Sequence, residues 1–157
     1  MARVCVDACF LIGLYDQDDQ HHATAIRQFS ALFGKPSAGH HLVAPWPILY
    51  ECLGTRYARD PRKTALLNQH WNILQRSQRL VLLEDKPFRE QSLAEQLQDR
   101  LRNLSLVDRV LRAMILDRKS LFDIFLTYNT ADFADACGKR GIPLLNEKSE
   151  PLAYVDH

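Results

Sequence analysis

The sequence predicts a single α/β domain over residues 1–157, in which helices cover both faces of a mostly parallel sheet in a three-layer α/β/α arrangement. Short runs of β-prone residues alternate with helical patterns along the chain, which is typical of such a sheet. No repeat, linker or low-complexity segment interrupts the alternation, and 46% hydrophobic residues suffice for one core. We expect about five strands: Arg3–Asp7, Leu42–Ala44, Leu80–Leu83, Phe122–Thr127 and Ile142–Leu145.

Three helices are expected in the first half of the chain, each indicated by a capping residue, a proline or apolar spacing. Asp19 is suited to cap a helix that runs to about Leu32 and carries apolar residues at helical spacing. The prolines of Pro45–Pro47 start a second helix after the second strand. An aspartate followed by proline at Asp60–Pro61 is a strong cap and first turn for the third helix. The expected buried face of this helix comprises Leu66, Leu67, Trp71 and Leu74.

Three more helices are expected in the second half. Pro87 opens a long amphipathic stretch, and Ser105 starts the next helix. The last helix covers Asp132–Lys139, between the fourth and fifth strands. The leucines of the amphipathic stretch are Leu93, Leu97, Leu101 and Leu104.

Composition excludes several classes of protein. No run of about 18 uncharged apolar residues is present, and the amino terminus lacks the features of a secretory signal peptide, so we expect a cytoplasmic protein without a membrane segment. The four cysteines form no C-x-x-C pair, and three of them lie in apolar runs. Buried free thiols are therefore expected rather than disulfides or a zinc site.

Charge is distributed unevenly along the chain. The segment from Arg56 to Lys119 holds 14 Lys and Arg against 8 Asp and Glu, a net charge of +6. The two flanks together hold 6 against 11, a net charge of −5. The basic middle is either a solvated helix surface or a surface that binds a polyanion.

Asp7 is the only charged residue in the apolar run from Val4 to Tyr15. A buried carboxylate without a partner costs several kcal/mol and usually changes its protonation state or binds a cation. The run offers no obvious helix for Asp7 to cap. A functional role is therefore favoured for this residue.

Three further carboxylates are expected at the same edge of the sheet. Glu51 follows the second strand, Asp132 follows the fourth, and Asp108 lies in the first turn of the helix opened by Ser105. In parallel α/β sheets, ligands bind outside the carboxyl ends of the strands. We therefore expect these three residues and Asp7 to lie on one edge, as candidate ligands of a hard cation.

Each of these three carboxylates also has a purely structural interpretation. Ser105-x-x-Asp108 matches the spacing of a capping box, and Asn129-x-x-Asp132 resembles one. Glu51 lies early in a helix, where the macrodipole favours an acid. The two interpretations are compatible, because a helix amino terminus keeps a carboxylate ionised and able to bind a cation.

Four motifs in order carry a resemblance to a known family. The chain contains V-D-A-C-F-L-I-G-L, P-I-L-Y-E-C-L, L-S-L-V-D-R-V-L, and F-L-T-Y-N-T-A-D-F followed by R-G-I-P-L-L. This order resembles the PIN domain, and within it the VapC-like ribonuclease toxins of toxin–antitoxin pairs. The resemblance implies a parallel sheet between helices and a cluster of acidic residues that binds one or two Mg²⁺ or Mn²⁺ ions to cut RNA.

Site residues follow from the resemblance position by position. It implies that Asp7, Glu51, Asp108 and Asp132 are the catalytic, metal-binding acids, with Thr127 and Asn129 as polar supports. Two positions depart from the family pattern, because Ala8 and Cys9 stand where the family often has Ser or Thr. One polar contact to the first aspartate is therefore expected to be missing. The segment 60–103 is also longer than in compact toxins.

The resulting expectation is a metal-dependent endoribonuclease, with RNA as substrate, a small antitoxin as partner and a homodimeric state. Arg109 and Arg112, beside Asp108, are candidate RNA contacts or solvated surface residues. Two alternatives stay open. One is a non-catalytic PIN-like module that binds RNA or protein, and the other is a PIN nuclease of RNA processing without an antitoxin.

Overall fold

Five parallel strands form the central sheet, in the order β3-β2-β1-β4-β5. The computed structural model describes residues 1–34, 39–98, 103–119 and 121–150. The α/β class and the parallel sheet expected from the sequence are confirmed. The strands are β1 (Arg3–Val6), β2 (His41–Pro45), β3 (Leu80–Leu83), β4 (Ile124–Leu126) and β5 (Leu144–Leu145).

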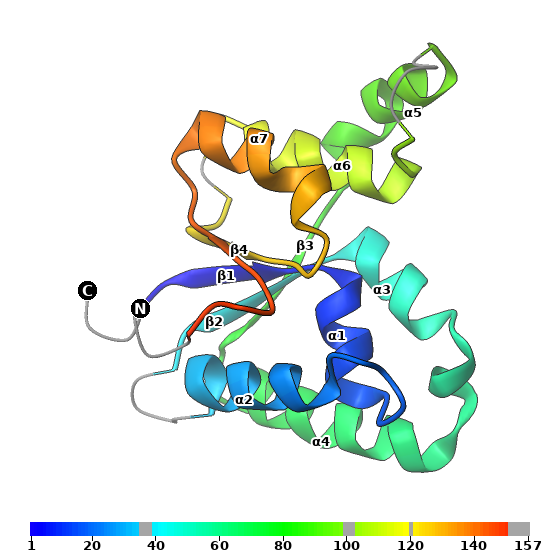
Figure 1. Cartoon of the computed structure of the whole chain (residues 1–157), viewed down its shortest axis with the longest axis vertical. Helices are drawn as coiled ribbons and strands as arrows, with labels where there is room; N and C mark the ends of the chain where they lie inside the picture. The colour runs from blue at the N-terminus through cyan, green and yellow to red at the C-terminus, as the bar shows by residue number, and fades with distance from the viewer. Residues whose placement is uncertain (35–38, 99–102, 120, 151–157) are drawn as a thin grey trace.

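Helices cover both faces of this sheet, which confirms the three-layer arrangement (Figure 1). On one face α1 packs against α2 and α4, and on the other α6 packs against α5 and α7. The α-helices are α1 (Ala8–Tyr15), α2 (His22–Phe33), α3 (Trp46–Leu53), α4 (Pro61–Arg76), α5 (Arg89–Gln98), α6 (Leu106–Leu116) and α7 (Thr130–Arg140), and short 3₁₀ helices cover Arg56–Arg59 and Lys86–Phe88. In the part of the chain that the structure describes, no helix is long and apolar enough to cross a bilayer.

The core lies along the three inner strands, β2, β1 and β4. Val4, Cys5 and Val6 of β1 are fully inaccessible to solvent, as are Phe125 and Leu126 of β4. A strand that is covered on both faces has no solvent side, so it consists of consecutive apolar residues rather than an alternating pattern. The carboxyl ends of β1 and β4 therefore emerge from the most buried part of the molecule.

Helix α1 was not expected from the sequence. It begins directly after β1, and Asp7 is its N-cap, with the Ala8 backbone nitrogen donating to Asp7 Oδ1 over 2.7 Å. The expectation that Asp7 has no helix to cap is therefore wrong. The helix buries residues on nearly every side, including Phe10 and Leu14, so it lacks the amphipathic period by which surface helices are identified.

Other helix starts agree with the sequence to within a few residues. Asp60 caps α4 as expected, because its Oδ1 accepts from the Arg62 nitrogen over 2.9 Å. Asp19 does not cap α2, which begins three residues later, and its Oδ1 instead accepts from the His21 nitrogen.

Three further expectations concern strand length, the amphipathic stretch and the cysteines. Strands β4 and β5 are both shorter than expected. The amphipathic stretch after Pro87 contains α5, while Leu101 lies outside the described residues. All four cysteines are free; Cys5, Cys52 and Cys137 are buried as expected, whereas Cys9 is half-buried.

Candidate metal centre

Asp7 is a buried carboxylate at the carboxyl end of β1. Its side chain is surrounded by protein, and the residue is only 5% exposed. Besides the α1 cap bond on Oδ1, its Oδ2 accepts from Thr127 Oγ1 over 2.8 Å and from Cys9 Sγ over 3.4 Å. Burial raises the pKa of Asp7 and outweighs these hydrogen bonds, which lower it. The fold thus holds a carboxyl group where its ionised form is costly.

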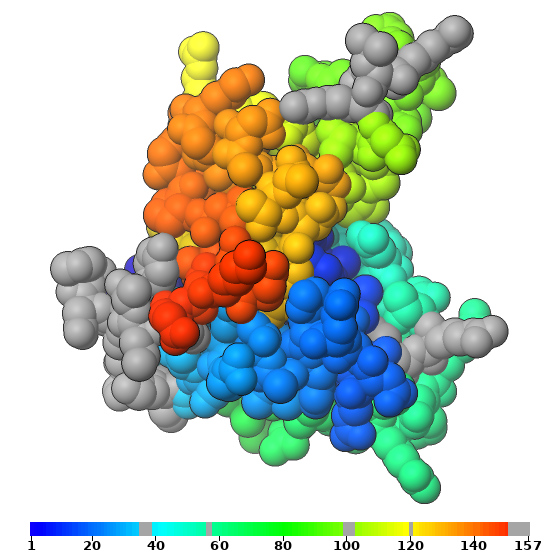
Figure 2. Space-filling model, viewed as in Figure 1, coloured from blue at the N-terminus to red at the C-terminus, as the bar shows by residue number. Residues whose placement is uncertain are grey.

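The other three acids lie on helices that surround the same edge of the sheet. Glu51 is on α3, which follows β2, while Asp108 and Asp132 lie in the first turns of α6 and α7. On the face drawn in Figure 2, α3 in cyan and the start of α7 in orange-yellow border dark-blue atoms of the amino-terminal part of the chain.

The four carboxylates interact electrostatically. Burial, followed by the charges of Asp7 and Asp108, raises the pKa of Glu51, although this residue is exposed on α3. Burial and the charge of Asp7 also raise the pKa of Asp108, hydrogen bonds from Ser105 lower it, and the charge of Asp132 raises it further. The charge of Asp132 likewise raises the pKa of Asp7. The charges of Asp7 and Asp108 thus act on Glu51, and the charge of Asp132 acts on Asp7 and Asp108.

The two capping interpretations have different outcomes. Ser105 caps α6, because its Oγ accepts from the Asp108 nitrogen over 3.1 Å. Asn129 makes no side-chain cap bond on α7. Its Nδ2 instead donates to Asp132 Oδ2 over 2.5 Å, and its backbone nitrogen donates to Thr127 Oγ1 over 3.0 Å. Asn129 therefore orients the Asp132 carboxylate rather than the helix terminus.

This donor set fits a hydrated divalent cation. All four side chains offer carboxylate oxygens, which hard cations prefer, and their mutual repulsion is relieved by positive charge. Within residues 1–34, 39–98, 103–119 and 121–150, no three His, Cys, Asp or Glu side chains are gathered closely enough to enclose a metal ion. A closed cage is not needed for Mg²⁺, which keeps several waters and binds one or two carboxylates directly.

Cys9 is a contact that the sequence did not reveal. The departure from the Ser or Thr of the family pattern predicted a missing polar contact to Asp7, but the Cys9 thiol donates to Asp7 Oδ2. The position of Cys9 could have indicated this hydrogen bond, since Cys9 lies in the first turn of the helix that Asp7 caps. The sequence pattern did not predict that helix, so the contact was not expected.

Arg109 and Arg112 both have protein partners. Arg109 is 5% exposed, and its Nε donates to Gln96 Oε1 over 2.7 Å. Arg112 pairs with both carboxylate oxygens of Asp135 at 2.6 and 2.8 Å, and its Nη1 also donates to the Asp132 carbonyl over 2.6 Å. The proposed RNA contacts of these arginines stay a prediction.

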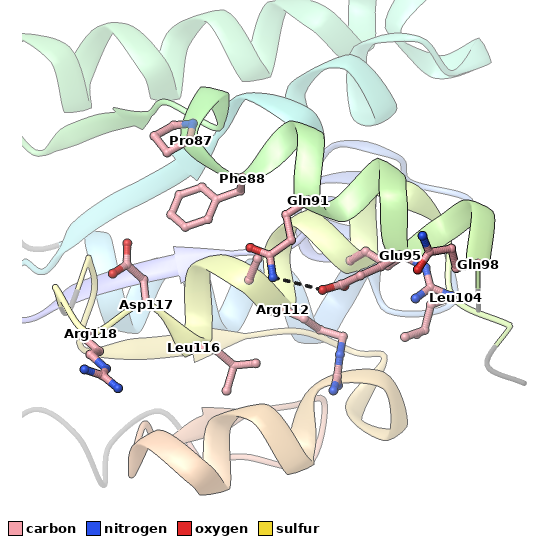
Figure 3. A pocket seen from close by; sticks show the side chains of 12 residues that line it. Pro87, Phe88, Gln91, Glu95, Gln98, Leu104, Arg112, Leu116, Asp117 and Arg118 are labelled. Carbon is pink, nitrogen blue, oxygen red and sulfur yellow. Dashed lines mark hydrogen bonds between the residues drawn. The ribbon is translucent and has the colours of Figure 1, made fainter.

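The two arginines line a cavity of about 740 Å³ between α5 and α6 (Figure 3). In the close-up, Arg112 points away from α5 toward α7, and Gln91 and Glu95 form the α5 side. None of the four carboxylates lines this cavity. A smaller cavity of about 200 Å³ is lined in part by Asp132.

This protein therefore has a parallel α/β fold with acidic residues at the carboxyl edge of its sheet. We compared it with known proteins. No family model matches the sequence, and no curated protein matches it. Among solved structures, the chain is similar to Mycobacterium tuberculosis VapC20, described as a sarcin–ricin loop cleaving toxin. The TM-score is 0.61 at 18% sequence identity, over 84% of this chain and 94% of that chain. The PIN-like, VapC-like fold expected from the motifs is thereby confirmed.

Proposed function

We propose that this protein is a metal-dependent endoribonuclease, the toxin of a toxin–antitoxin pair. The observation that carries the proposal is the group of four mutually repelling carboxylates around Asp7, at the sheet edge where parallel α/β proteins bind their ligands. VapC20, which has the same fold, is described as a toxin that cleaves the sarcin–ricin loop. RNA is therefore the proposed substrate class.

The proposed metal ligands are Asp7, Glu51, Asp108 and Asp132, with Mg²⁺ or Mn²⁺ as the ion. When bound, such an ion activates water and neutralises charge that develops on a phosphate, and hydrolysis then yields a 5′-phosphate and a 3′-hydroxyl. The protein side chains orient the acids. Thr127 Oγ1 fixes Oδ2 of Asp7, and Asn129 Nδ2 fixes Oδ2 of Asp132.

A non-catalytic binding module is the principal alternative. Such a module would gain nothing from placing an acid with a raised pKa at the end of β1, beside three others. Asp7 accepts three hydrogen bonds, from the Ala8 nitrogen, Thr127 and Cys9, which orient the carboxylate and offset part of the cost of ionising it in its buried position. A bound cation would offset the remaining cost, so an oriented, buried carboxylate at this place supports the enzyme.

The proposal extends to protein partners, namely a small antitoxin and a second copy of this chain. Large apolar side chains are exposed on α3, with Trp46 36%, Tyr50 74% and Leu53 48% exposed. Exposed apolar groups gathered on one helix are typical of protein contact surfaces. If they form the homodimer contact, sedimentation should give a dimer for the parent and a monomer for Tyr50→Glu. An unchanged dimer in the variant would remove α3 from the interface.

Cleavage of RNA tests the proposed activity directly. A sarcin–ricin-loop hairpin and an unstructured RNA are incubated with the protein in Mn²⁺, in Mg²⁺ and in a chelator. We expect cleavage only with a divalent ion, and a loss of at least about 100-fold in Asp7→Asn. Glu90→Gln removes one exposed carboxylate from α5 and serves as the matched control, with parental activity expected. A parent protein that binds RNA but leaves both substrates intact would favour the binding module.

A further inference from the structure

The Cys9 thiol lies between the turn from β1 to α1, which contains Asp7, and the turn that follows β4, which contains Tyr128. Its Sγ donates to Asp7 Oδ2 over 3.4 Å and accepts from the Tyr128 backbone nitrogen over 3.2 Å. It also lies 3.5 Å from Thr127 Oγ1, which itself donates to Asp7. One side chain thus contacts the buried carboxylate and the segment that follows β4.

These contacts link two parts of the chain that carry proposed metal ligands. Asp7 follows β1, and Asp132 is reached through the turn from Thr127 to Asn129 after β4. The two strands are neighbours in the sheet, with Val6 opposite Leu126. The thiol therefore bridges the carboxyl ends of adjacent strands.

The far side of the same turn is already fixed. Tyr128 Oη donates to Gln28 Oε1 over 2.7 Å, and Gln28 Nε2 donates to the Asn146 carbonyl over 2.7 Å. Gln28 is 2% exposed, and the rings of His21 and Tyr128 lie 4.6 Å apart. The Tyr128 side chain is thus held by Gln28 of α2, while its backbone nitrogen donates to Cys9. Through its own bond to Asp7, the Cys9 thiol connects this turn to the Asp7 carboxylate.

We propose that Cys9 is a positioning residue for the metal centre, which holds the Asp7 carboxylate in register with the turn that leads to Asp132. This inference rests on the proposed nuclease function and adds a residue to its site. A thiol suits the place because it is a weak donor and a weak acceptor at once, so that one atom serves both Asp7 and the Tyr128 nitrogen. Alanine offers neither bond, whereas serine offers both.

The number of bonds to Asp7 determines what it offers an ion. A carboxylate has about four lone-pair directions. Three are used by the Ala8 nitrogen, by Thr127 and by Cys9. One lone-pair direction of the Asp7 carboxylate therefore remains for an ion. Without the hydrogen bond from Cys9, the orientation of the carboxylate is less well defined, and so is this remaining direction.

Metal affinity separates this role from simple packing. Mn²⁺ binding to the full chain is measured by calorimetry for the parent, Cys9→Ala, Cys9→Ser and the control Cys137→Ala, which removes a buried thiol from α7. We expect Cys9→Ala to bind Mn²⁺ about 10-fold more weakly, as is usual for a residue that orients a metal ligand. Cys9→Ser should recover to within about threefold of the parent, and Cys137→Ala should lower only stability. Parental affinity in Cys9→Ala, or a serine variant as weak as alanine, would overturn the proposal.

Hydrogen exchange at the Tyr128 amide gives a readout that needs no metal. The amide donates to Cys9 Sγ, so its protection should fall about 10-fold in Cys9→Ala and persist in Cys9→Ser and Cys137→Ala. Unchanged protection in Cys9→Ala would overturn the link between the two turns. If the parent binds no Mn²⁺ while this pattern is observed, the proposed function fails and the link itself stands.

Discussion

Thr127 Oγ1 donates a hydrogen bond of 2.8 Å to Asp7 Oδ2, between two buried residues that are 120 positions apart in the sequence. The bond joins the carboxyl ends of β1 and β4, which are neighbours in the sheet. Thr127 is fully inaccessible, and its hydroxyl also accepts from the Asn129 nitrogen. One hydroxyl therefore orients the central carboxylate and the turn that carries the second support residue.

Replacing Thr127 with valine tests the structural value of this hydroxyl. Thr127→Val keeps the shape of the side chain but removes the donor to Asp7 and the acceptor for Asn129. We expect a loss of about 1–3 kcal/mol in the free energy of unfolding, the usual cost of leaving buried polar groups unpaired. Urea unfolding measures it, with Thr127→Ser as the control that keeps the hydroxyl. Equal loss in both variants would attribute the effect to packing.

The clustered acids predict a pH dependence of stability in the absence of metal. Burial first, and neighbouring charges next, raise the pKa of Asp7, Glu51 and Asp108. At pH values between the unfolded and the folded pKa, the folded state binds more protons than the unfolded state. The free energy of unfolding therefore falls as the pH rises through this window and is recovered when the pH is lowered again. His70 acts in the opposite direction below about pH 6.5, because burial lowers its pKa.

The difference in melting temperature between Asp7→Asn and the parent isolates the contribution of Asp7. In chelator, measured between about pH 5 and pH 8, this difference should grow as the pH rises, because ionisation of Asp7 costs stability in the parent only, and should shrink as the pH falls. A difference that is constant across this range would contradict the raised pKa of Asp7.

Arg112 is predicted to stabilise the fold. It is bound to both oxygens of Asp135 on α7 and to the Asp132 carbonyl. Arg112→Gln should therefore lower the free energy of unfolding by about 1–3 kcal/mol, since hydrogen bonds to charged groups are lost. The salt dependence of RNA binding tests its second, unproven role. A slope reduced by about one indicates a phosphate contact, and an unchanged slope indicates that Arg112 is structural only.

The sequence predicted the sheet better than the helices. Strands β1, β2 and β3 were predicted to within a residue or two. For the inner strands β1 and β2 the reason is that a strand buried on both faces is a short apolar run bounded by turn residues, and the edge strand β3 is likewise a short apolar run although Leu82 is exposed. Helix α1 is apolar on nearly every side, so it has no period from which to identify it. Missing α1 also hid the capping role of Asp7.

The positions of the four acids followed from topology, whereas their partners did not. Parallel strands end at one edge of the sheet, so the fold class alone predicted that Asp7 and Asp132 share an edge, while the pairing of β1 with β4 is a finding of the structure. The bond between Cys9 and Tyr128 spans 119 positions and depends on side-chain directions that no local pattern contains. The net charge of the segment from Arg56 to Lys119 likewise did not show which basic residues lie on the surface. This segment includes Arg79 and Arg109, each only 5% exposed.

The melting temperature with and without Mn²⁺, for the parent and Asp7→Asn side by side, tests the central claim that Asp7 holds a divalent ion. Without metal, the variant should melt at or above the parent, because asparagine also caps helices and relieves the repulsion among the acids. Added Mn²⁺ should raise the melting temperature of the parent, since a ligand that binds the folded state stabilises it, and should leave Asp7→Asn nearly unchanged. A variant that melts below the parent without metal and gains as much as the parent from Mn²⁺ would contradict the assignment of Asp7 as a metal ligand.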